Sequence, residues 1–335
     1  MLRIIVTGAT GNVGTRVVER LCRSEQVGEV VALARHHAPA LPDGVQFVAA
    51  DVARDPLEPL FRGADAVIHL AWLLQPSRDE RKLHRVNVEG TRRVLDAVVR
   101  AEVPHVVVAS SVGAYSPGPK DHGVDESWPT DGIPTSLYSR QKVMNERMMD
   151  GFEREHPGLV LTRMRPGLIF QRRASSEIKR LFVGRLVPRW LFKPSLVPFV
   201  PALPRFRFQA LHSSDVAEAF CRVVERKAGG AFNLAAGPVL DPSSLAETLH
   251  AKPLRIPAPV LRGLVSASFR LHLQPTDPGW IDIALQIPIM STARAQRELD
   301  WAPSMTSTAA LLELMEGIRD GAGTATFPLR PSRVT

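Results

Sequence analysis

The stretch that decides the fold is residues 2–14, Leu-Arg-Ile-Ile-Val-Thr-Gly-Ala-Thr-Gly-Asn-Val-Gly. Its apolar, β-branched start predicts a central strand of a parallel sheet that is covered on both faces. Gly8, Gly11 and Gly14 then recur at every third position, which predicts a tight turn into a helix. Because the free N–H groups of such a helix start favour negative charge, we interpret this turn as a phosphate-binding site.

A second apolar strand, Val30 to Ala34, follows at the distance expected of a dinucleotide-binding unit. A Gly-rich turn alone is weak evidence, since a purely structural turn has the same composition. Here the strand before the turn, the helix-compatible residues 15–22 after it and the second strand together favour dinucleotide binding.

Further apolar segments alternate with stretches of helical periodicity, which predicts βα units and a Rossmann-type, doubly wound parallel sheet in an α/β fold. The segments expected to be strands are residues 2–6, 30–34, 45–49, 66–71, 105–110 and 159–164. A helix from Ser213 or Ser214 and a strand at 232–236 are expected to return to the core. A long helix is expected over residues 80–101 and a loop over 116–135.

The amino-acid composition changes after Pro166. Residues 171–207 mix basic residues, aromatic residues and prolines, so we expect no regular sheet there. We therefore expect a second, smaller domain that is discontinuous and mainly helical. The expected division is a dinucleotide-binding domain from residues 1–166 and about 208–236, a substrate domain from 167–207 and 237–320, and a loose tail at 321–335.

The 335 residues carry two cysteines, Cys22 and Cys221, and a net charge of +8. Two distant cysteines imply no disulfide framework and suit a reducing compartment. A strand that starts at Leu2 leaves no room for a signal peptide, and no apolar run reaches the length of a membrane span, so we expect a cytoplasmic protein without a transmembrane segment.

Eleven Lys or Arg residues against one acid, Glu177, fall between Arg163 and Arg207. This surplus fits an anionic substrate and equally a solvated basic face. Trp190 and Phe199 in the same segment suggest an apolar wall for the substrate, and contact with an anionic membrane surface is a third interpretation. No helix-turn-helix, zinc or aromatic-sheet module supports binding to nucleic acid, and we expect no metal site.

Tyr138 and Lys142 lie four residues apart within a stretch whose apolar residues predict a helix, so both polar groups lie on one face. An ammonium beside a phenol lowers the pKa of the phenol, which makes it a usable proton donor and acceptor. Ser110 and Ser111 end a predicted strand at the carboxyl edge of the sheet, where such sheets bind ligands. The alternatives are a surface pair of tyrosine and lysine and a serine pair that caps the strand.

In these motifs the chain resembles the extended short-chain dehydrogenase/reductases, also called the NAD-dependent epimerase/dehydratase family. The matching motifs are Thr-Gly-Ala-Thr-Gly-Asn-Val-Gly (7–14), Asp51-Val52, Asp-Ala-Val-Ile-His-Leu-Ala (65–71), Asn-Val-Glu-Gly-Thr (87–91), Ala-Ser-Ser-Val-Gly-Ala-Tyr (109–115), Tyr138 with Lys142, Arg-Pro-Gly-Leu-Ile-Phe (165–170), Ser214-Asp215-Val216-Ala217, Phe-Asn-Leu-Ala-Ala-Gly (232–237) and Ala-Arg-Ala-Gln-Arg-Glu-Leu-Asp-Trp-Ala-Pro (293–303). The resemblance runs from residue 4 to about 315 and does not single out one activity.

The resemblance implies an NAD(P)-dependent oxidoreductase or epimerase/dehydratase that transfers hydride at a carbinol or carbonyl carbon. Tyr138 would be the catalytic acid/base, Lys142 would lower its pKa and Ser111 would orient the reacting oxygen. The residues expected at the cofactor are Gly8, Thr10, Gly11, Asn12, Val13, Gly14, Arg35, Asp51, Val52, Leu70, Ala71, Trp72, Asn87, Ser110, Tyr138, Lys142, Pro166, Gly167 and Leu168. Among them, Asn87 also fits a structural role.

Two departures from the family pattern are visible. The second strand ends Leu33-Ala34-Arg35-His36-His37, without an acid for the ribose 2′-hydroxyl of NAD, whereas Arg35 suits the 2′-phosphate of NADP. We therefore expect NADP(H), with NAD(H) as the alternative. Ser116 directly follows Tyr115, at a position where the family commonly has glycine.

The sequence leaves the substrate open between a ketone or aldehyde that is reduced and a nucleotide sugar that is epimerised. A different class of function is a sensor or regulatory module that binds NADP without turnover, and such a protein would be expected to lack the pair of Tyr138 and Lys142. The helices over 80–101 and 138–155 favour a homodimer that pairs through them.

Overall fold

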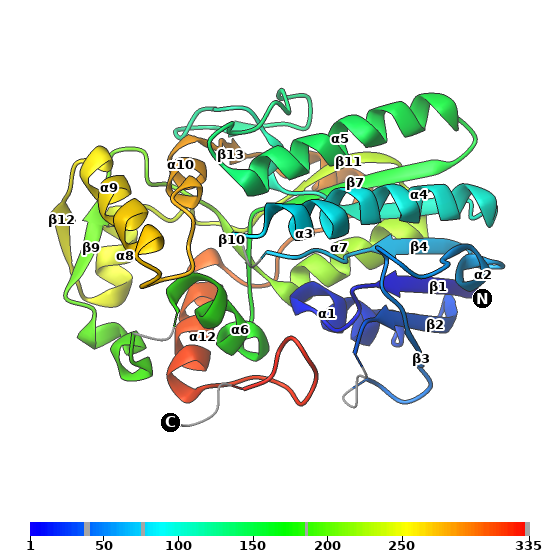
Figure 1. Ribbon diagram of the computed structural model, residues 1–335, viewed down its shortest axis with the longest axis horizontal. Helices are drawn as coiled ribbons and strands as arrows, with labels where there is room; N and C mark the ends of the chain where they lie inside the picture. The colour runs from blue at the N-terminus through cyan, green and yellow to red at the C-terminus, as the bar shows by residue number, and fades with distance from the viewer. Residues whose placement is uncertain (37–40, 75–77, 185–186, 332–335) are drawn as a thin grey trace.

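The computed structural model describes residues 1–36, 41–74, 78–184 and 187–331 (Figure 1). Its main sheet has seven parallel strands in the order β11-β7-β5-β4-β1-β2-β3. They are β1 (Leu2–Thr7), β2 (Val27–Ala34), β3 (Gln46–Ala49), β4 (Ala66–His69), β5 (His105–Ala109), β7 (Val160–Pro166) and β11 (Gly230–Leu234). The predicted doubly wound parallel sheet is confirmed, and each expected strand is present.

Helices cover both faces of this sheet (Figure 1). One face packs against α2 (Glu58–Phe61), α4 (Gly90–Arg100) and α5 (Leu137–Glu155), and the other against α1 (Asn12–Leu21), α7 (Ser213–Arg226) and α11 (Ala293–Leu299). In β1, Ile4 and Val6 are fully buried in one hydrophobic cluster and Ile5 is fully buried in the other. Successive side chains of a strand point to opposite faces, so an unbroken apolar run requires cover on both.

The helix predicted over residues 80–101 forms with one irregularity. It consists of α3 (Glu80–His84), a π-helical turn η1 (Arg85–Glu89) and α4. Asp79 caps its start by accepting a hydrogen bond from the N–H of Lys82. Single π-helical turns are frequent at functional sites, and this one carries Asn87.

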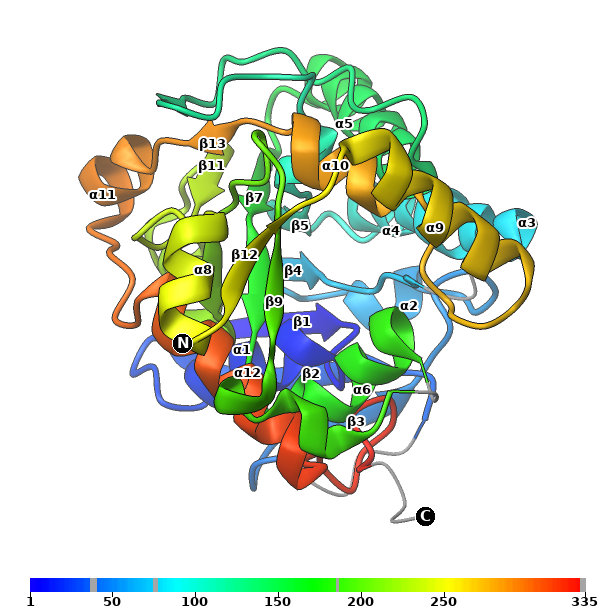
Figure 2. The same ribbon diagram turned by 90° about the vertical axis from the view of Figure 1, so that its left-hand side faces the viewer.

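The second part of the chain lies beyond the carboxyl ends of the main strands and is mostly helical (Figures 1 and 2). After β8 (Leu168–Phe170) its elements are η3 (Arg172–Ala174), α6 (Ser175–Ile178), η4 (Lys179–Val183), η5 (Arg189–Phe192), η6 (Pro194–Leu196), β9 (Phe199–Ala202), β10 (Ala210–His212), α8 (Pro242–Leu249), β12 (Lys252–Arg255), α9 (Ala258–Arg270), α10 (Gly279–Gln286), β13 (Ile289–Met290) and α12 (Ser307–Asp320). Within the described ranges, no helix combines the length and the hydrophobicity needed to cross a membrane.

Two short strands pair over long sequence distances. β9 lies in parallel beside β12 (Figure 2), so the expectation of no regular sheet in 171–207 is wrong for these four residues. Likewise β6 (Gly123–Val124), inside the predicted loop 116–135, pairs with β13. Local composition did not indicate either strand, because each is stabilised by a partner from a distant part of the chain.

The predicted loose tail is packed in its described part. Leu329 is fully buried, and Arg180 donates hydrogen bonds to the carbonyl oxygens of Pro328 and Arg330. The prediction is therefore wrong for residues 321–331, because contacts with the second part of the chain fix a segment that has no periodicity of its own. Residues 332–335 lie outside the described residues.

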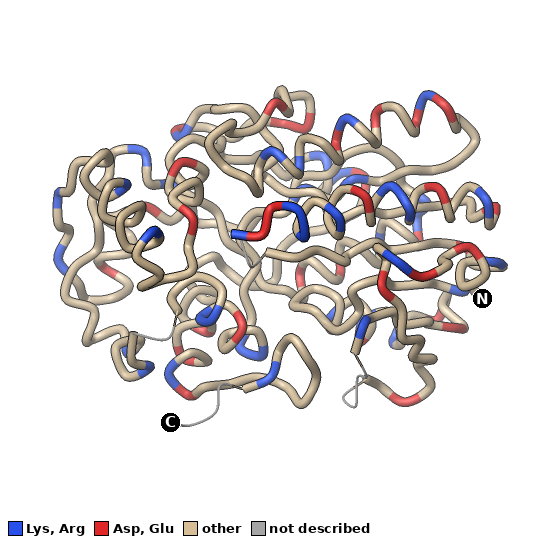
Figure 3. Tube along the Cα trace, viewed as in Figure 1, with Lys and Arg blue, Asp and Glu red and all other residues tan. Residues whose placement is uncertain are grey.

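Most basic residues between Arg163 and Arg207 bind partners within the chain, some of them buried and some at the surface. Arg163 and Arg165 lie in β7 and pair with Glu146, whose side chain is fully buried. Further pairs are Arg172 with Asp320, Arg173 with Glu19, Lys179 with the carbonyl of Gly184, and Arg205 with the carbonyls of Gly118 and Leu285. Arg185 lies outside the described residues. The surplus of positive charge in this segment is therefore largely paired within the chain. Elsewhere, Figure 3 shows acidic residues among the basic ones along α3 and α4.

Candidate active site

The loops that follow β1 and β4 meet at the carboxyl edge of the sheet. A Cβ atom on Gly8, whose φ is +70°, would lie 2.7 Å from the backbone nitrogen of Ala71, and one on Gly14 would collide with the carbonyl oxygen of Gly8. Leu70, which directly precedes Ala71, donates its N–H to the carbonyl of Thr7. Since the strand order reverses between β1 and β4, this is the place where open α/β sheets bind ligands.

Within the described residues, the first turn of α1 presents backbone N–H groups that have no hydrogen-bond partner. Gly11 caps the helix without a side-chain hydrogen bond, and a Cβ atom there would come no closer than 3.4 Å to the carbonyl of Gly8. The N–H groups of Asn12, Val13 and Gly14 precede the first intrahelical hydrogen bond, which Thr15 donates to Gly11. These residues therefore fit the phosphates of a dinucleotide.

The side chain of Asn12 has another role. Its amide donates to the carbonyl of Ile169, and its oxygen accepts hydrogen bonds from Ser213 and Gln171. It thereby fastens the start of α1 to the segment that follows β7. The backbone carbonyl of Asn12 accepts a further hydrogen bond from Gln171, which leaves its N–H for a ligand. The neighbouring Thr10 is buried in the turn.

Arg35, Asp51 and Val52 lie at the ends of β2 and β3. The carboxylate of Asp51 accepts a hydrogen bond from the N–H of Ala53 and so shapes the turn, and Val52 is buried. Arg35 is exposed directly after β2. His37, which follows in the sequence Arg35-His36-His37, lies outside the described residues.

Two predicted cofactor residues use their side chains within the protein. Asn87 binds the N–H and the carbonyl of Leu73 and donates to Gln141. Ser110 donates to the buried carboxylate of Glu146. Asn87 therefore holds the loop after β4, and Ser110 ties the end of β5 to α5.

Residues 166–168 lie at the carboxyl end of β7 and lead into β8. Gly167 donates its N–H to the carbonyl of Leu234, and a Cβ atom on it would lie 2.7 Å from the carbonyl oxygen of Gln209. Pro166 ends β7, and Leu168 begins β8 with its side chain partly exposed.

Tyr138 lies in the first turn of α5, next to Ser111. Ser136 caps this helix by accepting a hydrogen bond from the N–H of Ser139. A Cβ atom on Gly113 would lie 2.8 Å from Cε1 of Tyr138 and 3.4 Å from Oγ of Ser111, so the bare glycine makes room for both. Burial raises the pKa of Tyr138 to about 12, and its hydrogen bond with Ser111 opposes that shift. The phenol is therefore protonated at neutral pH and can donate its proton.

Lys142, one turn further along α5, points toward the end of β5. Its Nζ donates to the carbonyl of Ala109 at 2.8 Å and lies 3.5 Å from the ring centroid of Trp72. Burial lowers the pKa of Lys142 to about 7, against the opposing influence of Glu146. The expectation that Lys142 lowers the pKa of Tyr138 is therefore wrong for this arrangement. Burial and Ser111 set that pKa, because the amine of Lys142 is directed to Ala109 and Trp72.

Aromatic rings surround Tyr138, and of these sequence reasoning named Trp72 but missed Trp280 and Phe182. The ring of Trp280 in α10 lies 4.8 Å from that of Tyr138 at a tilt of 35°, and Trp72 meets Tyr138 edge-on at 5.7 Å. Phe182 in η4 packs edge-on against Trp280 at 5.0 Å. Trp280 and Phe182 lie far from Tyr138 in the sequence and outside every recognised motif, so no local signal pointed to them.

The structure thus gathers Tyr138, Ser111 and Lys142 at one place. A pocket beside them is lined by Trp72, Leu73, Leu74, Leu83, Ser136, Leu137, Tyr138, Gln141, Asp277 and Trp280. Among the described residues, no group of three or more His, Cys, Asp or Glu could hold a metal ion.

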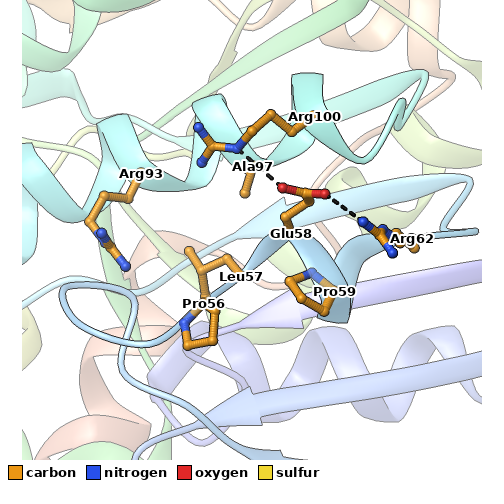
Figure 4. A pocket seen from close by; sticks show the side chains of 8 residues that line it. All are labelled: Pro56, Leu57, Glu58, Pro59, Arg62, Arg93, Ala97 and Arg100. Carbon is orange, nitrogen blue, oxygen red and sulfur yellow. Dashed lines mark hydrogen bonds and ion pairs between the residues drawn. The ribbon is translucent and has the colours of Figure 1, made fainter.

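A surface hollow of about 460 Å³ between α2 and α4 is separate from this site (Figure 4). Its Glu58 pairs with Arg62 and Arg100. The hollow lies toward the amino ends of the strands and contains none of the predicted site residues. We therefore place the candidate active site at Tyr138.

The model of the NAD dependent epimerase/dehydratase family matches residues 4–235. The uncharacterized protein Rv2047c of Mycobacterium tuberculosis is 26% identical over 335 residues, which cover 98% of this chain and 32% of that protein. The chain thus spans about a third of the length of the first curated relatives that it matches.

Two solved structures are similar in fold. UDP-glucose 4-epimerase of Thermotoga maritima, solved with UDP-glucose, has a TM-score of 0.72 at 18% identity, over 95% of this chain and 99% of that one. UDP-glucose 4-epimerase of Thermus thermophilus, solved as a complex with NAD, has a TM-score of 0.68 at 21% identity, over 95% and 99% of the two chains.

Proposed function

The chain belongs to the NAD-dependent epimerase/dehydratase family, and on that premise we propose that it is a nicotinamide-dependent oxidoreductase or epimerase with Tyr138 as its acid/base. The observation that carries this proposal is the contact of Tyr138 with Ser111 beside the buried amine of Lys142. A nicotinamide dinucleotide, when bound, supplies or accepts the hydride, which is chemistry that protein side chains lack.

The chain's own residues hold the oxygen and move the proton. Ser111 orients the reacting oxygen of the substrate, and the phenol of Tyr138 gives its proton to that oxygen as the carbonyl carbon is reduced. A pKa of about 12 keeps the proton on Tyr138 until then. In the reverse direction Tyr138 must first lose this proton, and a positive charge on Lys142 would assist.

We propose NADP(H) as the preferred cofactor, with NAD(H) as the alternative. The support is Arg35, which is exposed at the end of β2 where an acid would otherwise bind the ribose 2′-hydroxyl. A guanidinium pairs with a phosphate through two parallel hydrogen bonds. The backbone of residues 11–14 and the loop of Ala71 are proposed to bind the diphosphate.

We propose that residues 1–166 and 208–236 bind the cofactor and that 167–207 and 237–320 shape the substrate site. Met144 on α5 is an exposed apolar side chain, which supports a homodimer through α4 and α5. The two free cysteines support a reducing compartment such as the cytoplasm.

The alternative function is a sensor that binds the dinucleotide without turnover. To separate the two, the purified protein is incubated with NADPH or NADH and a panel of carbonyl compounds and nucleotide sugars. We expect turnover that Tyr138→Phe lowers by roughly a hundredfold or more, with cofactor affinity unchanged because the ring remains. Tight cofactor binding without turnover of any compound would favour the sensor.

A further inference from the structure

Helix α9 turns an apolar face to the solvent. None of its residues is buried, and Val260, Leu264 and Leu271, which directly follows the helix, are 52%, 62% and 69% exposed. Together with the exposed Ala267 they are spaced by three or four positions, so they lie within about 60° of one another around the helix axis. We call these four residues the apolar stripe. Because helices of globular proteins normally turn such a stripe toward the core, an outward one indicates a binding surface.

The opposite side of α9 is fixed to the rest of the protein. Arg262 forms a bidentate ion pair with Asp282 of α10, and the guanidinium of Arg78 lies 4.1 Å from the centroid of the Phe269 ring. Arg262 and Phe269 lie about half a turn around the helix axis from the apolar stripe. These contacts therefore hold the apolar stripe outward.

The two-stranded sheet of β9 and β12 lies at the same end of the molecule as α9 (Figures 1 and 2). Val200 of β9 is buried, so the adjacent Phe199 points to the opposite face, where it is 52% exposed. Phe199 pairs in register with Lys252, and Pro201 pairs with Leu254, so these residues share the outward face. Phe199 and Leu254 thus add exposed apolar surface at this end.

Unpaired positive charges accompany this apolar surface. Residues 248–276 contain four Lys or Arg and no acid, and Figure 3 shows basic positions on β12. Within the described ranges, the exposed side chains of Lys252, Arg255 and Arg270 have no hydrogen-bond or ion-pair partner. The fourth, Arg262, is paired with Asp282. This end of the protein therefore combines apolar side chains with cations that are available to a partner.

We propose that this end of the protein binds the surface of an anionic membrane, with the apolar stripe among the lipid headgroups and Lys252, Arg255 and Arg270 at lipid phosphates. A helix with an exposed apolar face and neighbouring basic residues has the features of a helix that lies in a membrane interface. Basic residues near an anionic leaflet strengthen such binding. This proposal is independent of the chemistry proposed for Tyr138.

A second copy of the chain fits this surface less well than a membrane does. Pairing of two copies through the apolar stripe would bring Lys252, Arg255 and Arg270 of one copy toward the same residues of the other. Residues 248–276 offer no acid to neutralise them. Because like charges oppose such a contact whereas lipid phosphates attract the same cations, charge favours the membrane.

The test measures binding of the full chain to vesicles by co-sedimentation. One set of vesicles is pure phosphatidylcholine, and in the other about one third of the lipid is the anionic phosphatidylglycerol. We expect binding to be at least about tenfold tighter to the anionic vesicles and to weaken when salt is raised from about 0.1 M to about 0.5 M. No binding to the anionic vesicles would overturn the proposal.

Two combined variants separate the apolar and the charged contributions. Leu264→Gln with Leu271→Gln should weaken binding to anionic vesicles roughly tenfold or more, because two leucine side chains no longer leave water. Lys252→Glu with Arg255→Glu and Arg270→Glu should weaken it roughly a hundredfold or more, because three cations at the lipid are replaced by anions. All five side chains are exposed, so we expect both proteins to fold, which circular dichroism checks.

Matched variants elsewhere in the chain serve as controls. Arg23→Glu with Arg54→Glu and Arg297→Glu makes the same change in net charge at exposed positions on other elements. It should weaken binding by less than about threefold, because salt screens charges that lie far from the lipid. Phe327→Gln replaces another exposed apolar side chain and should leave binding unchanged.

The remaining outcomes assign the surface differently. Equal losses in the two charge variants would show that net charge alone drives binding, and an unchanged affinity of the Leu264→Gln and Leu271→Gln protein would remove the apolar stripe from the contact. Self-association that this double variant abolishes, without binding to vesicles, would assign the surface to a second copy. Each of these results would overturn the proposal and leave the proposed function at Tyr138 untouched.

Discussion

Cε1 of Tyr138 lies only 2.8 Å from the position that a Cβ atom on Gly113 would occupy. A methyl group at residue 113 therefore requires the phenol ring, or the turn that carries Ser111, to move. Position 113 controls the geometry of the proposed acid/base although it contributes no functional group.

Gly113→Ala is accordingly expected to lower kcat by roughly ten- to a hundredfold, because a displacement of about 1 Å is costly for a reaction that depends on orientation. Cofactor affinity, measured by titration with NADPH, should change little. Gly151→Ala within α5 is the matched control, since a Cβ atom there would come no closer than 4.0 Å to the end of the Arg154 side chain. It should retain activity and gain up to about 1 kcal/mol of stability. Full activity of Gly113→Ala would mean that the ring of Tyr138 need not occupy this position.

Arg35→Ala is expected to weaken binding of NADPH by tenfold or more and binding of NADH by less than about threefold. The reason is the loss of a bidentate contact to a phosphate that only NADPH carries. Dissociation constants of both dinucleotides, measured by fluorescence at one fixed salt concentration, check this. Arg23→Ala, also exposed but at the other end of α1, is the control for general loss of positive charge. Equal effects of Arg35→Ala on the two cofactors would contradict the proposed NADP preference.

The sequence predicted the parallel sheet and its first turn well because their signals are local. The run Ile4, Ile5 and Val6 is apolar on both faces, and its two faces lie in the two clusters that flank the sheet. Gly8 and Gly14 stand where the backbone leaves no room for a side chain. Such positions constrain residue type through neighbours that lie close in the chain.

The part of the chain beyond the main sheet was harder to predict because its structure depends on distant partners. β9 pairs with β12, some fifty residues further along the chain, and Trp280 reaches Tyr138 because α10 docks on α5. For the same reason, the count of basic residues in 163–207 did not reveal that Arg163 and Arg165 are buried and paired. Both lie in a buried strand and pair with acids of α5, namely Glu146, Asp150 and Glu153.

The buried carboxylate of Glu146 is expected to be important for stability. Burial alone would raise its pKa, but hydrogen bonds and charge from Arg165, together with Ser110 and Arg163, hold it below the usual value. Glu146→Gln leaves two arginines without their shared acid and should lower the free energy of unfolding by about 3–5 kcal/mol. Urea denaturation followed by circular dichroism checks this. Glu155→Gln, at the exposed end of the same helix, should change stability by less than about 0.5 kcal/mol.

Mild acid should destabilise the protein through two buried histidines. Burial lowers the pKa of His69 to about 3, with the charge of Lys142 adding to the shift, and burial together with Lys227 lowers the pKa of His105 to about 4. Unfolded histidine binds protons near pH 6.5, so between that value and the folded pKa the unfolded state binds more protons and stability falls as the pH falls. Each residue contributes at most about 1.4 kcal/mol per pH unit in this window.

The measurement is the free energy of unfolding at pH 7.5, 6.5 and 5.5. We expect little change between the first two values and a marked loss between the last two. His69→Gln retains hydrogen-bonding groups for Thr7 and Thr91, which the imidazole contacts. It removes the titrating ring, so its loss between pH 6.5 and 5.5 should be smaller by about 1 kcal/mol. The exposed His122→Gln should behave like the unchanged protein, and an equal loss in all three proteins would show that these buried imidazoles do not set the acid limit of the fold.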